Sequence, residues 1–200
     1  MKNILVIKAS ILGDSGNSNA LLDAHVAALK SAHPEAKVVI RDVGGEGIPH
    51  LDGSRVAAFF TPQDQRSAEQ QQVDDFSMAL IDELKQADQV VLGLPMYNFG
   101  VPSQFKSWFD HVARAGVTFK YTETGPVGLL DDKPVTVIAA RGGMYAGTAN
   151  DTVTPFIKLI FGFVGIQSVS FIYAEGLNIS DDEKAKAMAA ARDALESKVA

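Results

Sequence analysis

The tripeptide GDS at residues 13–15 has the residue types of an attacking serine. In one class of esterases this tripeptide carries the nucleophile, which needs a histidine base that is oriented by a carboxylate. The four histidines of the chain are His25, His33, His50 and His111, so none lies in the last part of the sequence, where those esterases carry theirs. We expect His25 and His33 on a solvated helix face, and His111 at the surface or in helix packing. The sequence therefore disfavours a serine hydrolase.

The same loop has the residue types of a phosphate site. It contains neither G-x-G-x-x-G nor G-x-x-x-x-G-K-[ST], so the dinucleotide and nucleoside-triphosphate loops are excluded. Ser10, Asn17 and Ser18 supply hydroxyl and amide donors beside the start of a predicted helix, and Gly16 permits a tight turn. Because the loop has no Lys or Arg, neutral donors and the helix dipole would hold the anion. The alternative is that Ser and Asn merely cap the helix.

Two further segments carry groups that suit a flat, amphipathic ring. PMYNF at 95–99 ends an apolar run with aromatic side chains, an amide and backbone donors. ARGG at 140–143 ends the next run, and its paired glycines let the backbone approach a ligand closely. In a parallel sheet, loops at the carboxyl ends of strands converge on one edge. A phosphate loop, an aromatic strand end and a glycine edge together predict a site for flavin mononucleotide (FMN).

Short apolar runs alternate with helical patterns along the chain, and these elements must position the three loops. We expect strands at 3–8, 37–42, 88–96, 133–140 and 168–175, and helices at 19–33, 67–87, 103–115, 151–165 and 180–199. The Gly- and Pro-rich stretch 43–66 is expected to be irregular, and 117–130 to form an inserted hairpin after the third βα unit. This alternation predicts an α/β fold: one flavodoxin-like domain over 1–200, with a doubly wound, five-stranded parallel sheet in the order 2-1-3-4-5.

The composition excludes several classes of protein. A net charge of -6 without clustered Lys or Arg argues against binding to nucleic acid or to an anionic membrane. The absence of cysteine excludes disulfides, a thiol nucleophile and iron–sulfur clusters, and it fits a cytoplasmic protein. Lys8 interrupts the first apolar run too early for a secretion signal, and no run reaches the length of a membrane span. No metal-binding spacing occurs, so no metal is expected.

Over nearly its whole length the chain resembles the flavodoxin-like azoreductases, the family of FMN-dependent NADH:quinone oxidoreductases. The resemblance rests on KASIL, PMYNF, ARAGVTFKYTETGP, ARGG and YAEG. It implies a homodimer with one FMN per subunit at the interface, which NADH reduces and which quinones or aromatic azo compounds reoxidise. It assigns cofactor binding to Ser10, Gly16, Asn17, Ser18, Met96, Tyr97, Asn98, Phe99, Ala140, Arg141, Gly142 and Gly143. Two positions depart from the family pattern: the loop around Asn17 differs, and Ala140 stands where relatives often carry a serine.

The flavin performs the chemistry in such an enzyme, so no catalytic acid or base is assigned to the protein. Phe60, Phe119, Tyr121 and Phe163 are candidate apolar walls for flat acceptors, with ordinary core or dimer packing as the alternative. NADH is favoured over NADPH because no basic cluster offers itself to a 2′-phosphate. Since donor and acceptor would use one open face of the flavin, a ping-pong mechanism is expected, giving hydroquinones from quinones and amines from azo compounds.

Two other functions stay open on the sequence. A flavodoxin-type electron carrier would also bind FMN, although the mild net charge and the long stretch 43–66 favour an enclosed substrate site. A GDS-type serine esterase is the more remote alternative.

Overall fold

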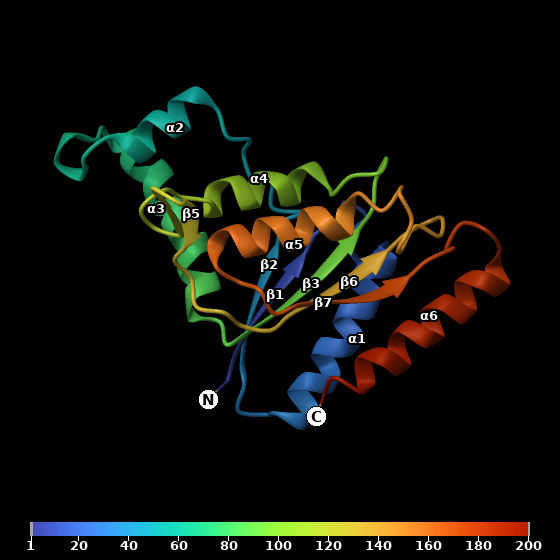
Figure 1. The fold of residues 1–200 in the computed structure, drawn as a ribbon. Helices are drawn as coiled ribbons and strands as arrows, with labels where there is room; N and C mark the ends of the chain where they lie inside the picture. The colour runs from blue at the N-terminus through green and yellow to red at the C-terminus, as the bar shows by residue number, and fades with distance from the viewer. Residues whose placement is uncertain (1, 200) are drawn as a thin grey trace.

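Five parallel strands form the central sheet of the computed structural model, which describes residues 2–199 (Figure 1). They are β1 (Asn3–Lys8), β2 (Lys37–Asp42), β3 (Gln89–Pro95), β6 (Val135–Ala140) and β7 (Val169–Ala174). Their order is β2-β1-β3-β6-β7, which confirms the predicted order 2-1-3-4-5. Both β3 and β6 are buried at every residue, which explains why they appear in the sequence as continuous apolar runs.

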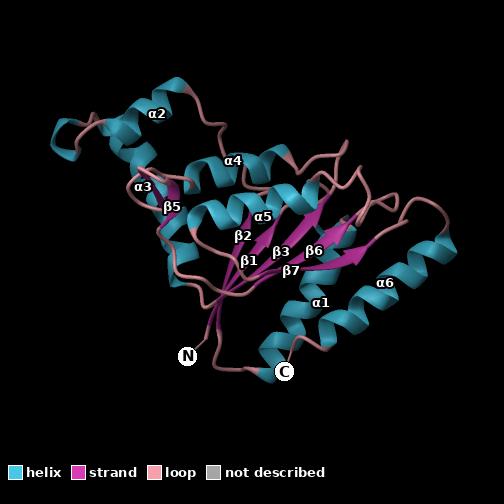
Figure 2. Ribbon diagram, in the orientation of Figure 1, coloured by secondary structure: helices cyan, strands magenta, loops and turns pink. Residues whose placement is uncertain are grey.

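Helices cover both faces of the sheet (Figure 2). One face carries α1 (Asn17–Ala32) and α6 (Asp181–Glu196), and the other carries α3 (Ala68–Gln86), α4 (Ser103–Val112) and α5 (Val153–Val164). Alternate strand residues point to opposite faces, so β1 sends Ile4 and Val6 into the core under α1 and α6, and Leu5 and Ile7 into the other core. Two apolar cores therefore hold the sheet rigidly at the base of the predicted site.

The stretch 43–66 is not irregular throughout, and the prediction was wrong over its middle. It contains the helix α2 (Gly53–Phe60), which Asp52 caps by accepting a hydrogen bond from the N–H of Arg55 at 2.9 Å. The helix α2 stands out from the body at the upper left of Figure 1 and is joined to α3 by a short 3-10 helix (Gln63–Gln65). The Gly and Pro residues of this stretch suggested a loop, but a capped helix begins at one of them, Gly53.

The predicted hairpin over 117–130 is confirmed. It consists of the antiparallel strands β4 (Phe119–Thr122) and β5 (Gly125–Gly128). Its base is tied to the end of α5 by a hydrogen bond from the N–H of Leu130 to the carbonyl of Val164 at 2.9 Å. In Figure 1 the hairpin lies to the left, whereas the arrowheads of the sheet point to the right, so hairpin and strand ends occupy different parts of the fold.

Candidate functional site

A hollow of about 180 Å³ lies where the strands end, and all three predicted loops line it. Its lining comprises Ser10, Leu12, Gly16, Asn17, Ser18, Pro95, Met96, Tyr97, Ala140, Arg141, Gly142, Leu177 and Asn178. Met96 and Tyr97 also line an adjoining open hollow of about 650 Å³, together with Asn98. The fold thus brings most of the predicted cofactor residues together at the carboxyl edge of the sheet.

Leu177 and Asn178 line the same hollow but were missed from the sequence. They follow β7, the last strand, whose carboxyl end reaches the same edge as β1, β3 and β6. The YAEG segment at 173–176 therefore marked a fourth loop of the site.

The first turn of α1 has no side-chain cap. The cap residue of the helix is Gly16, so the capping alternative is wrong. The first backbone N–H groups of the helix consequently have no partner within it. The hydroxyl of Ser18 is buried and has no hydrogen-bond partner among the described residues. Free backbone donors and an unpartnered hydroxyl at a helix N-terminus are the groups that bind a phosphate.

Ser10 and Gly16 fit against each other at the floor of this loop. Ser10 is buried, and its Oγ accepts a hydrogen bond from the N–H of Leu12 at 3.2 Å and lies 3.2 Å from the hydroxyl of Tyr97. A Cβ atom on Gly16 would lie 2.2 Å from Ser10 Oγ, which leaves no room for any side chain. The glycine therefore serves close packing at the predicted phosphate site.

Ser15 does not have the surroundings of a nucleophile. It is exposed in a 3-10 helix (Gly13–Ser15), and within residues 2–199 no hydrogen bond joins it to a histidine. His50 Nδ1 contacts Ser107 Oγ at 2.8 Å, and His111 Nε2 contacts the carbonyl of Pro49 at 3.0 Å. The ring of His111 also packs edge-on against Phe59 of α2 and Phe76 of α3, which is the expected helix packing. The structure gives the GDS tripeptide no hydrolytic machinery.

The expectation for His25 was wrong. It is buried between α1 and α6 rather than on a solvated face, and burial lowers its pKa. The side chain packs against Leu195 and Arg192 of α6 around a small cavity. This contact depends on the docking of the last helix, which the helical pattern of α1 does not specify.

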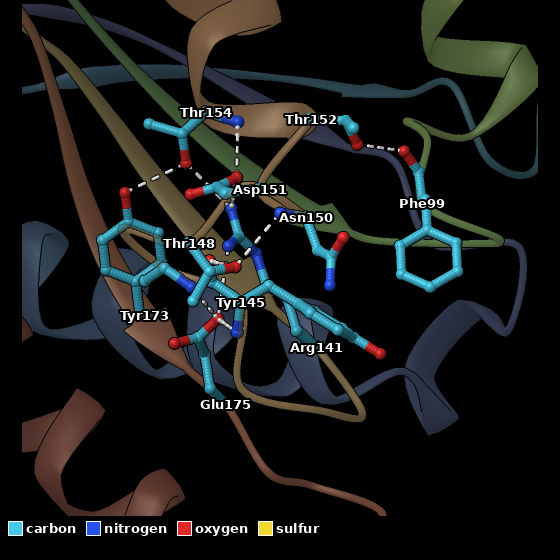
Figure 3. Close-up of polar contacts among 11 residues, drawn as sticks. Phe99, Arg141, Tyr145, Thr148, Asn150, Asp151, Thr152, Thr154, Tyr173 and Glu175 are labelled. Carbon is cyan, nitrogen blue, oxygen red and sulfur yellow. Dashed lines mark hydrogen bonds and ion pairs between the residues drawn. The ribbon is translucent and has the colours of Figure 1, made fainter.

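The PMYNF segment ends in a tight turn. The N–H and carbonyl of Tyr97 pair with those of Gly100 at 2.9 Å, and Asn98 and Phe99 between them have φ values of 49° and 62°. Such left-handed values in residues other than glycine each cost roughly 1–3 kcal/mol and persist where the surroundings enforce them. Here the hydroxyl of Thr152 donates to the carbonyl of Phe99 (Figure 3). The turn presents Phe99 to solvent at the rim of the site.

The glycine edge is a second closely packed segment. The N–H groups of Gly176 and Asn178 donate at 3.0 Å to the carbonyls of Gly143 and Gly142, so two strand-end loops run side by side. A Cβ on Gly142 would lie 2.5 Å from Asn178 Nδ2, and one on Gly143 would lie 2.7 Å from the ring of Tyr145. In the described chain the N–H groups of these two glycines donate to no other protein group, so they remain available to a ligand.

Arg141 differs from the neighbouring residues of the site because its charged group is buried and paired with carboxylates. Its guanidinium lies inside the protein, 2.9 Å from Asp151 and 3.2 Å from Glu175, with its side chain fully buried (Figure 3). Burial alone would raise the pKa of Asp151, but hydrogen bonds from Arg141 and Thr154 outweigh it and hold that pKa below its usual value. The charged end of Arg141 is thus already occupied by carboxylates of its own chain.

The four candidate substrate residues do not reach this hollow from their own chain. Phe119 packs on Phe163 with ring centroids 4.3 Å apart, beside the hairpin and the end of α5. Phe60 and Tyr121 are exposed, with 74% and 75% of their surface accessible. None of the four lines the hollow. Within one chain, the packing alternative holds for Phe119 and Phe163.

Residues 2–199 contain neither a helix suited to span a membrane nor a cluster of metal-binding side chains. No helix there combines the length and the apolar character that crossing a membrane requires. No group of three His, Cys, Asp or Glu side chains is placed to hold a metal ion in the same part of the chain.

Known proteins resemble this chain in both sequence and structure. A protein named FMN-dependent NADH:quinone oxidoreductase from Alcanivorax borkumensis is 67% identical over 193 residues, which cover 96% of this chain and 98% of that protein. A protein of the same name from Cellvibrio japonicus is 52% identical over the full length of both. The crystal structure of an FMN-dependent NADH-azoreductase from Bacillus anthracis, in complex with FMN, matches with a TM-score of 0.90 at 26% identity, over 100% of this chain and 98% of that one.

The similarity to known families extends over all the described residues. A protein family described as having the flavodoxin-like fold matches residues 2–199. Together with the relatives at 67% and 52% identity, this match shows to which family the chain belongs. The chain belongs to the flavodoxin-like family of FMN-dependent NADH:quinone oxidoreductases.

Proposed function

We propose that this protein is an FMN-dependent oxidoreductase that transfers two electrons from NADH to quinones and to aromatic azo compounds. The observation that carries the proposal is the hollow at the carboxyl edge of the sheet, which joins an uncapped helix N-terminus to a glycine edge with free N–H groups. The relative from Bacillus anthracis whose structure contains FMN has the same fold. Bound FMN would supply the redox chemistry, and the protein its binding and orientation.

The phosphate of FMN would occupy the start of α1. Backbone N–H groups at Asn17 and Ser18 and the hydroxyl of Ser18 offer neutral donors there, and the helix dipole adds favourable potential. Binding the phosphate would give the buried hydroxyl of Ser18 the partner that it lacks in the protein alone. This is a specific reason for FMN rather than for a ligand without phosphate.

The ring system would lie along Met96, Tyr97 and Asn98, with its polar edge toward the N–H groups of Gly142 and Gly143. Negative charge develops on this edge when the ring is reduced, and donors fixed in advance stabilise such charge most effectively. The missing hydroxyl at Ala140 removes one side-chain contact, but these backbone donors do not depend on it.

A second copy of the chain would complete the site, and we propose a homodimer. Phe60, Tyr121 and Leu159 expose 74%, 75% and 70% of their surface, which is a large amount for apolar side chains of this size. In a dimer these surfaces would be covered, and the aromatic residues that miss the hollow of their own chain would form walls over that of the partner. Flat aromatic acceptors would bind between such walls.

Steady-state kinetics test the proposed function. If one face of the ring lay against the protein, NADH and the acceptor would have to take turns at the other face, because hydride transfer requires near contact. We expect parallel double-reciprocal lines when NADH is varied at several fixed quinone concentrations. Cleavage of an azo bond to two amines takes four electrons, so it should consume about two NADH, and a quinone about one. Intersecting lines would contradict the shared site. If NADH and a quinone gave no turnover unless a separate reductase was added, the protein would instead be an electron carrier.

A further inference from the structure

The loop that carries the glycine edge is held from beneath by one carboxylate oxygen. Glu175 Oε1 accepts hydrogen bonds from the backbone N–H groups of Tyr145 at 2.8 Å and Ala146 at 2.9 Å (Figure 3). The same oxygen accepts from Arg141 Nη1 at 3.2 Å. Glu175 follows β7 and is 12% exposed at its side chain.

Arg141 extends this attachment to the start of α5. Its Nη2 donates to Asp151 Oδ1 at 2.9 Å and to Thr154 Oγ1 at 2.8 Å. Asp151 in turn accepts from the N–H of Thr154 at 3.0 Å. The loop between β6 and α5 is therefore hydrogen-bonded in its middle to Glu175, just after β7, and at its end to the first turn of α5. Because the side chains of Arg141, Asp151 and Glu175 are almost completely shielded from solvent, water weakens these charge-assisted hydrogen bonds only a little.

Tyr145, whose N–H group Glu175 binds, contacts both the glycine edge and the aromatic turn. Its ring lies against Gly143, where a Cβ would meet it at 2.7 Å. The ring also packs edge-on against Phe99, with centroids 5.4 Å apart. A displacement of Tyr145 would thus move both the glycine edge and the aromatic turn.

We propose that Glu175 is a positioning residue for the cofactor, a role that rests on the proposed function. Glu175 is not among the residues that line the hollow. It fixes Tyr145, Ala146 and Arg141, and thereby holds the N–H groups of Gly142 and Gly143 in the arrangement that receives FMN. Without it, the loop would populate other arrangements, and the apparent affinity would fall by the fraction that remains competent.

Three variants separate this role from general stability. Glu175→Ala removes all the bonds to Oε1. Glu175→Gln retains an oxygen that accepts them, because every hydrogen bond found for this carboxylate uses Oε1. Asp132→Ala is the matched control: Asp132 Oδ1 likewise accepts from two consecutive backbone N–H groups, those of Gln167 and Ser168, at 2.8 and 2.9 Å, in the loop that precedes β7.

The readouts are FMN affinity by fluorescence titration of the apoprotein, the thermal midpoint, and amide hydrogen exchange at Tyr145 and Ala146. We expect Glu175→Ala to weaken FMN binding about tenfold or more and to speed both exchanges, whereas Glu175→Gln stays within about threefold of wild type. Asp132→Ala should lower the midpoint yet leave FMN affinity nearly unchanged. If Glu175→Ala fails to fold, Glu175→Asp, whose shorter side chain does not reach both N–H groups, takes its place.

Three results would overturn the inference and leave the proposed function standing. The first two are unchanged FMN affinity in Glu175→Ala, and equal weakening in Glu175→Ala and Asp132→Ala. Equal weakening in the Ala and Gln variants would also overturn it, because hydrogen bonding would then not be the cause. If the wild-type protein binds no FMN, the proposed function fails, and the inference fails with it.

Discussion

Gly16→Ala is expected to weaken FMN binding about a hundredfold, or ~2.7 kcal/mol. The added Cβ would lie 2.2 Å from Ser10 Oγ and 2.8 Å from Ser10 Cβ, so Ser10 must move. Ser10 is hydrogen-bonded to Leu12 and lies beside the hydroxyl of Tyr97, and its displacement would disturb the phosphate loop and the aromatic turn together. The φ of Gly16 is -76°, which alanine adopts readily, so the effect is steric rather than conformational.

Fluorescence titration of the apoprotein with FMN measures this loss. Gly53→Ala is the matched control, because a Cβ there meets nothing within 4 Å and the residue begins α2, away from the hollow. It should bind FMN as the wild type does. Equal FMN affinity in Gly16→Ala and wild type would show that the phosphate does not bind at this loop.

Asp74→Ala should lower the free energy of unfolding by about 3–5 kcal/mol, the cost of leaving a buried ion pair without one partner. Asp74 accepts from Arg114 at 2.7 Å and from Arg66 at 2.6 Å, with only 11% of its side chain exposed. Arg114 also lies over the ring of Phe59, 3.7 Å from its centroid. The substitution therefore leaves Arg66 and Arg114 without a carboxylate partner and weakens the packing of α2 on α3.

Urea denaturation of the apoprotein gives this value. The adjacent Asp75→Ala serves as control, because Asp75 is exposed and, within residues 2–199, its side chain accepts a hydrogen bond only from Gln71. That change should stay within about 0.5 kcal/mol of wild type. A similar small loss in Asp74→Ala would mean that the buried ion cluster does not hold α2.

The sheet was predictable because burial on both faces makes a strand a continuous apolar run. The strand order β2-β1-β3-β6-β7 followed from the alternation of strands and helices. The helix α2 was missed because glycines and prolines around it carried the stronger local signal. Only the cap at Asp52 and the apolar residues that follow it marked a helix.

The three loops of the site were predictable because strand ends converge, but the roles of single side chains were not. Arg141 appears in the sequence as part of the glycine edge, yet Asp151 and Glu175 hold its charge inside the protein. The importance of Glu175 depends on backbone N–H groups about 30 positions earlier, which no local pattern reveals. Similarly, the direction of α5 places Phe163 at the hairpin, and spacing along the chain does not predict that.

Anaerobic titration of the FMN-loaded protein with NADH tests the central claim most directly. The purified protein, incubated with FMN and freed of excess, should retain about one yellow flavin per chain, and about one NADH per flavin should bleach its absorbance. Addition of a quinone should restore the colour. A protein that retains no FMN, or whose bound flavin keeps its colour in excess NADH, would contradict the account.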